Sequence, residues 1–302
     1  MTTAFIFPGQ GSQAVGMGKA LSLAFPEARA VFDEVDAALG QKLSALMFDG
    51  AEAELTLTSN AQPALMAVSV AVIRALQAEA GLDLKRDASF VAGHSLGEYS
   101  ALAAAGALSL ADTARLLRIR GDAMQKAVPA GIGAMAALLG ADLALAAIIA
   151  GEAAGPQVCD VANDNGGGQV VISGHKEAVA RAIEIAKTKG VRRAMLLPVS
   201  APFHCQLMRP AADAMREALA KVPVMPPAVP LVANVTAAAV TDPAAIAANL
   251  VAQVTGSVRW RESLQFMAGA GITRFVEAGS GKVLAGLVRR IDADEYVGLP
   301  RE

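Results

Sequence analysis

Short apolar runs and longer amphipathic stretches alternate along this chain of 302 residues. The apolar runs that predict strands of a main sheet are residues 5–7, 89–92, 231–234 and 273–278. The stretches that predict helices are residues 19–24, 27–39, 64–80, 98–105, 112–126, 207–221, 243–253, 262–268 and 282–291, with a charged loop at 83–87. Because parallel strands need a crossover that is usually a helix, this alternation predicts a parallel sheet covered by helices.

The middle of the chain departs from this simple alternation. Its pattern predicts strands at residues 134–139, 158–162, 169–173 and 195–199, and helices at 143–150 and 176–189. The resulting order, βαββαβ, is that of the ferredoxin-like split unit. The predicted fold class is therefore α/β, with a hydrolase-like parallel-sheet core of residues 1–127 and 200–302 and an inserted ferredoxin-like subdomain of residues 128–199.

Composition favours a soluble enzyme with a large aliphatic core, since 54% of residues are hydrophobic and 18% are charged. The net charge of -2 argues against a nucleic-acid partner, and two cysteines cannot form a disulfide scaffold. The start of the chain lacks the pattern of a signal peptide. Residues 131–151 form the one membrane-like stretch, and Asp142 divides it into pieces too short to span a bilayer. The expected localisation is cytoplasmic.

Residues 93–97 read GHSLG and lie between a predicted strand and a predicted helix. A G-x-S-x-G sequence in that context is the signature of a nucleophile elbow, although glycines beside a serine also occur in ordinary tight turns. We therefore take Ser95 as the candidate nucleophile for covalent acyl transfer.

A serine nucleophile needs a general base, and the chain has three histidines. His94 adjoins Ser95 and is expected to point away from it and to bond locally, whereas His175 begins a helix and is expected to be exposed. His204 follows a strand-like run, where functional side chains of α/β folds gather, and is the predicted base. Either an acidic side chain or a backbone carbonyl could orient it, and no Asp or Glu stands out. Cys205, its neighbour, is expected to be buried filler.

A glycine loop at residues 9–14 follows the first predicted strand and allows two interpretations. It fits G-x-G-x-x-G/A of dinucleotide sites, but Asp33 and Glu34, at about the distance of the expected acidic residue, lie in a helical stretch. The loop could instead supply one backbone N–H to an oxyanion, with the second from Leu96, the residue after the nucleophile.

Four ordered segments resemble one known family, the malonyl-CoA:acyl carrier protein transacylases, which are acyltransferases of fatty-acid and polyketide synthesis. The segments are residues 7–13 (FPGQGSQ), 93–99 (GHSLGEY), 120–121 (RG) and 201–204 (APFH). The resemblance extends over essentially the whole chain, including the inserted subdomain.

The resemblance implies a role for each matched residue. Ser95 would bear the acyl group, His204 would be the base and would be held by a backbone carbonyl, and Arg120 would pair with the free carboxylate of malonate. The amides of Gln10 and Leu96 would form the oxyanion hole. The remaining residues that would bind substrate or line the site are Gln253, Phe203, Gln62 and Asn163, with Phe203 and Leu96 resembling the malonyl-selecting pattern. Arg120 could instead be a solvated helix arginine like Arg115 and Arg118.

The implied reaction moves a malonyl group from malonyl-CoA to the phosphopantetheine thiol of acyl carrier protein through a malonyl-serine, supplying fatty-acid synthesis. It implies no metal and no cofactor of the enzyme's own, no membrane partner, and a monomer. Two alternatives stay open at this point, a serine hydrolase and a nicotinamide-binding protein. The basic residues that could receive an acidic carrier are Lys187, Lys189, Arg192, Arg193, Arg289 and Arg290.

Overall fold

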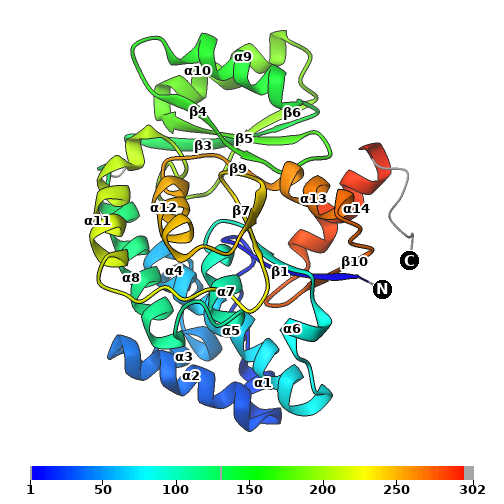
Figure 1. The fold of residues 1–302 in the computed structure, drawn as a ribbon. Helices are drawn as coiled ribbons and strands as arrows, with labels where there is room; N and C mark the ends of the chain where they lie inside the picture. The colour runs from blue at the N-terminus through cyan, green and yellow to red at the C-terminus, as the bar shows by residue number, and fades with distance from the viewer. Residues whose placement is uncertain (1, 130, 296–302) are drawn as a thin grey trace.

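The computed structural model describes residues 2–129 and 131–295 and contains two five-stranded sheets. We call the one in the larger, lower part of Figure 1 the large sheet and the one in the smaller, upper part the small sheet. The large sheet has the order β10-β1-β2-β7-β8, formed by Arg274–Glu277, Thr3–Phe7, Phe90–Gly93, Leu231–Ala233 and Ala238–Val240. Its first four strands run parallel, as the sequence predicts. The fifth, β8, was not predicted and pairs antiparallel with β7.

The small sheet has the order β6-β3-β5-β4-β9, formed by Arg193–Leu196, Gly133–Leu139, Gln169–His175, Cys159–Asp164 and Val258–Arg259. Its first four strands pair antiparallel in the ferredoxin-like order, and helices α9 (Leu143–Ala154) and α10 (Lys176–Thr188) cover its outer face (Figure 1). The predicted α/β class, with a parallel core and an inserted βαββαβ unit, is confirmed.

Strand β9 was not predicted from the sequence. It shows that the small sheet includes a strand from a segment outside the predicted insertion. It belongs to the C-terminal segment, yet Val258 and Arg259 pair in parallel with Asn163 and Asp164 of β4. The domain bounds 1–127 with 200–302 and 128–199 therefore stay a prediction, because the small sheet includes a strand from outside residues 128–199.

The helices agree with the predicted pattern in most places. They are α1 Lys19–Ala24, α2 Pro26–Leu39, α3 Leu43–Asp49, α4 Glu52–Thr56, α5 Thr58–Ala80, α6 Leu84–Asp87, α7 Gly97–Ala104, α8 Leu110–Lys126, α9 Leu143–Ala154, α10 Lys176–Thr188, the 3-10 helix η1 Gln206–Met208, α11 Arg209–Leu219, α12 Pro243–Gln253, α13 Trp260–Gly269 and α14 Val283–Glu295. Helices α3 and α4 were not predicted, and α6 replaces the charged loop, since Asp83 caps it by accepting from the Lys85 N–H at 3.0 Å.

Helix α5 corrects the prediction that residues 131–151 are the one membrane-like stretch. By length and composition α5 could cross a membrane, but 72% of its most apolar window is buried inside the protein. Residues 131–151 lie mainly in β3 and α9, joined by a turn, in agreement with the strand predicted at 134–139 and the helix predicted at 143–150. The apolar face of α5 therefore belongs to the protein core.

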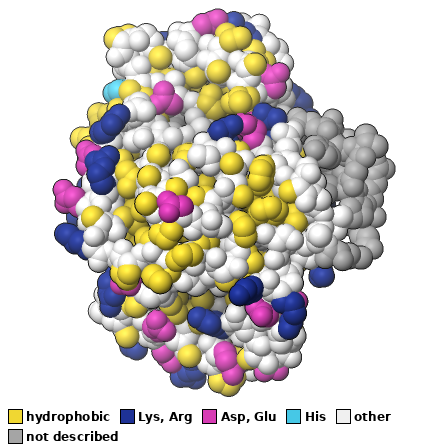
Figure 2. All heavy atoms as spheres, viewed as in Figure 1, with side chains coloured by type: hydrophobic (Ala, Val, Ile, Leu, Met, Phe, Trp, Pro, Cys, Tyr) yellow, Lys and Arg dark blue, Asp and Glu magenta, His cyan; other side chains and the backbone are white. Residues whose placement is uncertain are grey.

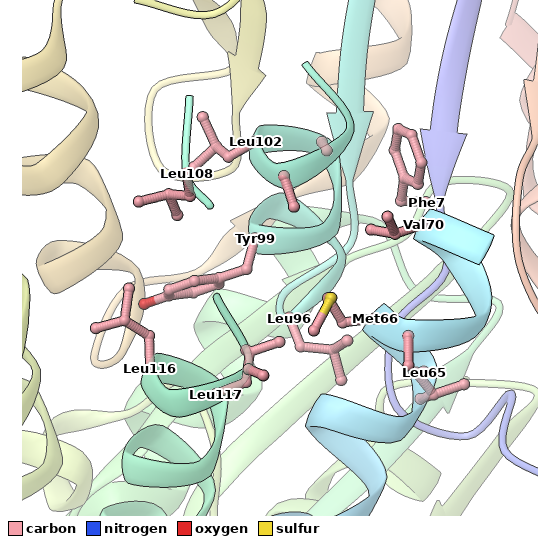
Figure 3. Close-up of a cluster of buried hydrophobic side chains, with 14 of the residues drawn as sticks. Phe7, Leu65, Met66, Val70, Leu96, Tyr99, Leu102, Leu108, Leu116 and Leu117 are labelled. Carbon is pink, nitrogen blue, oxygen red and sulfur yellow. The ribbon is translucent and has the colours of Figure 1, made fainter. Parts of the chain in front are cut away.

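Both faces of the large sheet are buried, which explains its continuous apolar strands. Along β1, Phe5 and Phe7 pack into the core formed with α5, α7 and α8, whereas Ala4 and Ile6 pack against α13 and α14. Figure 3 shows the first of these clusters, where Tyr99 and Leu96 of the elbow segment lie among leucines of α8 and side chains of α5. The elbow is thus held on a rigid, fully packed support.

One face of the molecule shows apolar side chains gathered around α12 and the chain leading to β7, with charged side chains toward the edges (Figure 2). A groove of about 580 Å³ is lined by residues of α11 and α12, among them Arg209, Arg216, Leu219 and Val251, and by Thr255. None of the predicted site residues lines this groove.

Candidate active site

The turn between β2 and α7 has the geometry of a nucleophile elbow. Ser95 lies at φ 54°, a left-handed conformation that non-glycine residues seldom adopt and that is strained for serine. A side chain on Gly93 would come within 1.9 Å of the Gly97 backbone, and one on Gly97 within 2.2 Å of the Phe7 carbonyl oxygen. Both glycines are therefore required by close packing, and an ordinary turn does not explain the strained serine between them.

His204 meets Ser95 across the end of the large sheet. Its Nε2 lies 2.8 Å from the Ser95 Oγ, and its Nδ1 lies 2.9 Å from the Gln253 backbone oxygen. Since a carbonyl can only accept, Nδ1 bears the proton and Nε2 is free to accept from the serine hydroxyl. The orienting group is thus a backbone carbonyl, one of the two possibilities the sequence leaves open.

The electrostatic surroundings keep His204 neutral. Burial, followed by the nearby Arg120 charge, lowers the pKa of His204 to about 3. A neutral imidazole is the form that can take a proton, so His204 is available as a base throughout the neutral pH range.

Arg120 is a buried residue and not a solvated helix arginine. Its side chain is 1% exposed, whereas Arg115 on the same helix is exposed. One terminal nitrogen donates to Gln62 Oε1 at 2.7 Å, and the other donates to Gln253 Oε1 at 2.8 Å and to Ser95 Oγ at 3.1 Å. A guanidinium held beside the nucleophile is well placed to recognise an anionic group on an acyl substrate.

Gln253 links three parts of the site. Its backbone oxygen holds His204, its side-chain oxygen accepts from Arg120, and its Nε2 donates to the Ser95 carbonyl at 3.0 Å. The same Nε2 donates to Glu98 Oε2 at 2.8 Å. Gln253 therefore fixes His204, Arg120 and the Ser95 backbone relative to one another.

Asn234 is a site residue that the sequence did not reveal. Its Oδ1 accepts from the Ser95 N–H at 2.8 Å and its Nδ2 donates to the Gly93 carbonyl at 2.7 Å, so it clamps both sides of the elbow. In sequence it stands out only as a formal glycosylation acceptor in N-V-T. The available signal was its position as the last residue of the predicted strand 231–234, at the strand end where polar residues of α/β folds meet.

The glycine loop lies against the elbow. A side chain on Gly9 would approach the His94 carbonyl oxygen to 2.7 Å, so Gly9 allows the loop to come close. The Gln10 side chain accepts from Thr58 Oγ1 at 2.9 Å, which leaves its backbone as the part that can face a substrate. Leu96 is 1% exposed and precedes α7, where backbone N–H groups lack intrahelical acceptors.

The other predicted residues lie around this centre with different contacts. Gln62 is buried and bonds both Arg120 and Thr58 Oγ1, and Phe203 is 8% exposed beside His204. Asn163 reaches His94 instead of Ser95, with its Nδ2 3.4 Å from His94 Nε2. The structure therefore brings Arg120 and Gln253 against Ser95, with Gln62 bonded to Arg120, whereas Asn163 contacts His94, the residue before Ser95.

The two remaining histidines differ from expectation. His94 does point away from Ser95, but its partner is not local, because its Nε2 lies 2.9 Å from the Oδ1 of Asn165, the residue that follows β4 of the small sheet. His175 is half-buried, not exposed, and its Nδ1 accepts from the Val158 N–H at 2.9 Å. Cys205 is fully buried, as predicted. Across residues 2–129 and 131–295, no group of three or more His, Cys, Asp and Glu side chains could hold a metal ion.

The parallel core, the strained serine and its histidine are typical of α/β enzymes that form an acyl-serine. A family model described as "Acyl transferase domain" matches residues 4–292. The malonyl CoA-acyl carrier protein transacylase of Bacillus subtilis is 47% identical over 96% of this chain and 90% of its own length. The chain therefore belongs to the acyl transferase family, among the malonyl CoA-acyl carrier protein transacylases.

Solved structures agree with this assignment. The acyl-carrier-protein-S-malonyltransferase from Bartonella henselae superposes with a TM-score of 0.95 at 57% identity, covering 97% of this chain and 93% of the other. A type II polyketide synthase acyl-carrier protein in complex with its malonyl-transacylase also matches, with a TM-score of 0.93, 43% identity and coverage of 96% and 93%.

Proposed function

We propose that this acyltransferase moves a malonyl group from malonyl-CoA to the phosphopantetheine thiol of acyl carrier protein and so supplies fatty-acid synthesis. The observation that carries the proposal is the set of contacts on the Ser95 hydroxyl, which lies 2.8 Å from the His204 base and 3.1 Å from the Arg120 guanidinium. Relatives named malonyl CoA-acyl carrier protein transacylase, which match nearly the full chain, support the proposal.

The first half-reaction acylates the serine. Ser95 Oγ attacks the thioester carbonyl while its proton passes to His204 Nε2, and the backbone amides of Leu96 and Gln10 stabilise the oxyanion that forms. Collapse of this intermediate breaks the carbon–sulfur bond, and His204 returns the proton to the departing CoA thiolate. The second half-reaction is the reverse, with the thiol of the carrier protein as nucleophile.

The selectivity for malonyl is assigned to Arg120. A guanidinium matches a carboxylate with two parallel charge-assisted hydrogen bonds, which an acetyl group cannot form. Gln62 and Gln253 each accept from a different terminal nitrogen of Arg120, so they fix the plane of the guanidinium before substrate arrives. Phe203 and Leu96 are proposed to line the acyl pocket, and Asn163 to support its edge through His94.

The proposed partners are malonyl-CoA and acyl carrier protein, and the proposed state is a cytoplasmic monomer that needs no metal or cofactor beyond the phosphopantetheine of the carrier. Among the basic residues predicted to receive the carrier, Lys187 and Lys189 already pair with Glu184 and Glu152 on the outer side of the small sheet. This pairing lowers the charge they could offer to an acidic partner.

A covalent-intermediate experiment tests the proposal. Incubation of the purified protein with malonyl-CoA is expected to add one malonyl group to Ser95, detected by mass spectrometry of the peptide, and holo carrier protein is expected to remove it. Ser95→Ala should give no adduct and no transfer. Ser100→Ala is the matched control, because Ser100 is a buried serine in the helix that follows the elbow.

The result also separates the alternatives. A serine hydrolase would release the malonyl group to water at the same rate with or without carrier protein. A nicotinamide-binding protein would form no adduct, and NAD would bind with measurable affinity. Either result would contradict the proposed transfer.

A further inference from the structure

Glu98 is a buried carboxyl group that the proposed mechanism leaves unused. It is the second residue of α7, and its side chain is fully buried. Its Oε2 accepts from the Gln253 Nε2 at 2.8 Å and from the Asn234 backbone N–H at 3.1 Å. Burying a carboxyl group without a direct ion pair costs free energy. We expect this cost to be offset by what the hydrogen-bond partners of Glu98 do in the site.

The contact with Gln253 decides which end of that side-chain amide faces Arg120. In the observed orientation the amide oxygen accepts from Arg120 and the amide nitrogen donates to Glu98 and to the Ser95 carbonyl. The reversed orientation would turn the NH₂ donors toward the guanidinium donors and the oxygen toward two other acceptors. An acceptor at position 98 therefore favours the orientation that holds Arg120.

The contact with Asn234 fixes the elbow from the other side. Glu98 holds the Asn234 backbone, and the Asn234 side chain bonds the Ser95 N–H and the Gly93 carbonyl. One carboxyl oxygen thus connects the Gln253 side-chain amide, which holds Arg120, with the backbone of Asn234, whose side chain holds the elbow.

We propose that Glu98 is a positioning residue: by accepting from Gln253 and Asn234 it sets the Arg120 guanidinium for a carboxylate-bearing acyl group, and so it contributes to selectivity for malonyl over acetyl. This inference rests on the proposed function, because it assigns Glu98 a part in the same site. The Glu98 side chain hydrogen-bonds Gln253 and Asn234 and not the Ser95 hydroxyl, so it acts through these two residues.

The proposed role of Glu98 depends on an acceptor oxygen at the position of its Oε2. Glutamine keeps such an oxygen and nearly the same shape. Leucine and methionine keep much of the volume but leave the Gln253 NH₂ and the Asn234 N–H without this acceptor, so the amide of Gln253 can rotate away from Arg120. The matched control is again Ser100→Ala, a buried change on the same helix whose hydroxyl has no hydrogen-bond partner among the described residues.

The test measures kcat and KM with malonyl-CoA and acetyl-CoA for wild type, Glu98→Gln, Glu98→Leu, Glu98→Met and Ser100→Ala, with Arg120→Ala as the reference for lost selectivity. Wild type and Ser100→Ala are expected to share one malonyl-to-acetyl ratio of kcat/KM, and Glu98→Gln to stay within about threefold of it. Glu98→Leu and Glu98→Met are expected to lower the ratio by roughly tenfold, in the direction of Arg120→Ala and mainly through a higher KM for malonyl-CoA.

Two outcomes would overturn the inference. One is a folded Glu98→Leu or Glu98→Met protein, judged by circular dichroism, that keeps the wild-type ratio. The other is a Glu98→Gln protein as impaired as Glu98→Leu, since the acceptor would then not be the property that counts. If Glu98→Leu does not fold, Glu98→Met decides, and if neither folds, a wild-type ratio in Gln253→Leu overturns the proposal. Failure of the proposed function is a separate result, because wild type itself would then transfer no malonyl group.

Discussion

The two sheets of this molecule contribute very unequally to the site. The segments of the large sheet supply the candidate nucleophile Ser95 and its hydrogen-bond partner Asn234, and the helices packed on the sheet supply Arg120 and Gln253. From the small sheet, the recorded contacts at the elbow come from Asn163 and Asn165, and both go to His94.

The difference follows from how each sheet is connected. In the large sheet, β1, β2 and β7 run parallel, so the loops after them gather at one edge and can meet around a substrate. In the small sheet the first four strands are antiparallel, so their ends are divided between two edges. The inserted small sheet therefore lies beside the site, and the residues in contact with Ser95 come from the parallel core.

The largest expected difference between the two regions concerns two histidines. His204→Ala removes the base at the core edge and is expected to lower kcat/KM by roughly 10² to 10⁴, the usual range for general acid–base catalysis. His175→Ala, at the end of β5 in the small sheet, is expected to change kcat/KM by less than about twofold, because no contact connects it with Ser95. Steady-state kinetics with malonyl-CoA and carrier protein measure kcat/KM of both variants. Comparable losses of kcat/KM would contradict the conclusion that the catalytic side chains come from the parallel core.

Much of the core geometry could be predicted because its signals are local. The elbow is specified by two glycines around Ser95 between a strand and a helix, and His204 could be selected because the chain has three histidines. The ferredoxin-like unit could be predicted because its six elements follow one another without interruption. In each case neighbouring residues carry the pattern.

What could not be predicted depends on pairing between distant segments. Strand β9 is two residues long and exists because Val258 lies beside Asn163, so no periodicity marks it. The Asn234 clamp joins residues that are 139 positions apart, and the Asn165 contact with His94 joins residues 71 apart. The burial of Glu98 was invisible for a related reason, since a glutamate after an elbow usually indicates a solvated helix start.

The second expected effect concerns how the buried core carboxyl responds to pH. Burial raises the pKa of Glu98 from an ordinary value of 4.5 to about 7, against the smaller opposing effects of Asn234, Gln253 and Arg120. The stabilisation of the folded protein that is linked to this raised pKa is therefore fully present below pH 4.5 and is lost as pH rises through 7. The separation of the two pKa values corresponds to roughly 3 kcal/mol, and Glu98→Gln removes this dependence.

Urea unfolding of wild type and Glu98→Gln at pH 5 and pH 8 measures the effect. The variant is expected to gain roughly 2 to 3 kcal/mol relative to wild type between these two pH values. Glu262→Gln is the matched control, because the Arg259 hydrogen bond holds the pKa of Glu262 below its usual range, so its titration lies below pH 5. Parallel pH curves for wild type and Glu98→Gln would show that Glu98 stays in one protonation state.

The smallest expected effect compares two asparagines that hold the elbow from different sheets. Asn165→Ala removes the 2.9 Å partner of His94, which should cost about 1 to 2 kcal/mol of stability and less than about fivefold in kcat/KM. Asn234→Ala frees the Ser95 peptide itself and should lower kcat/KM by about tenfold or more at a similar cost in stability. Urea unfolding and steady-state kinetics on the two variants test this. Equal losses of kcat/KM would mean that the small sheet positions the nucleophile as strongly as the core does, through His94.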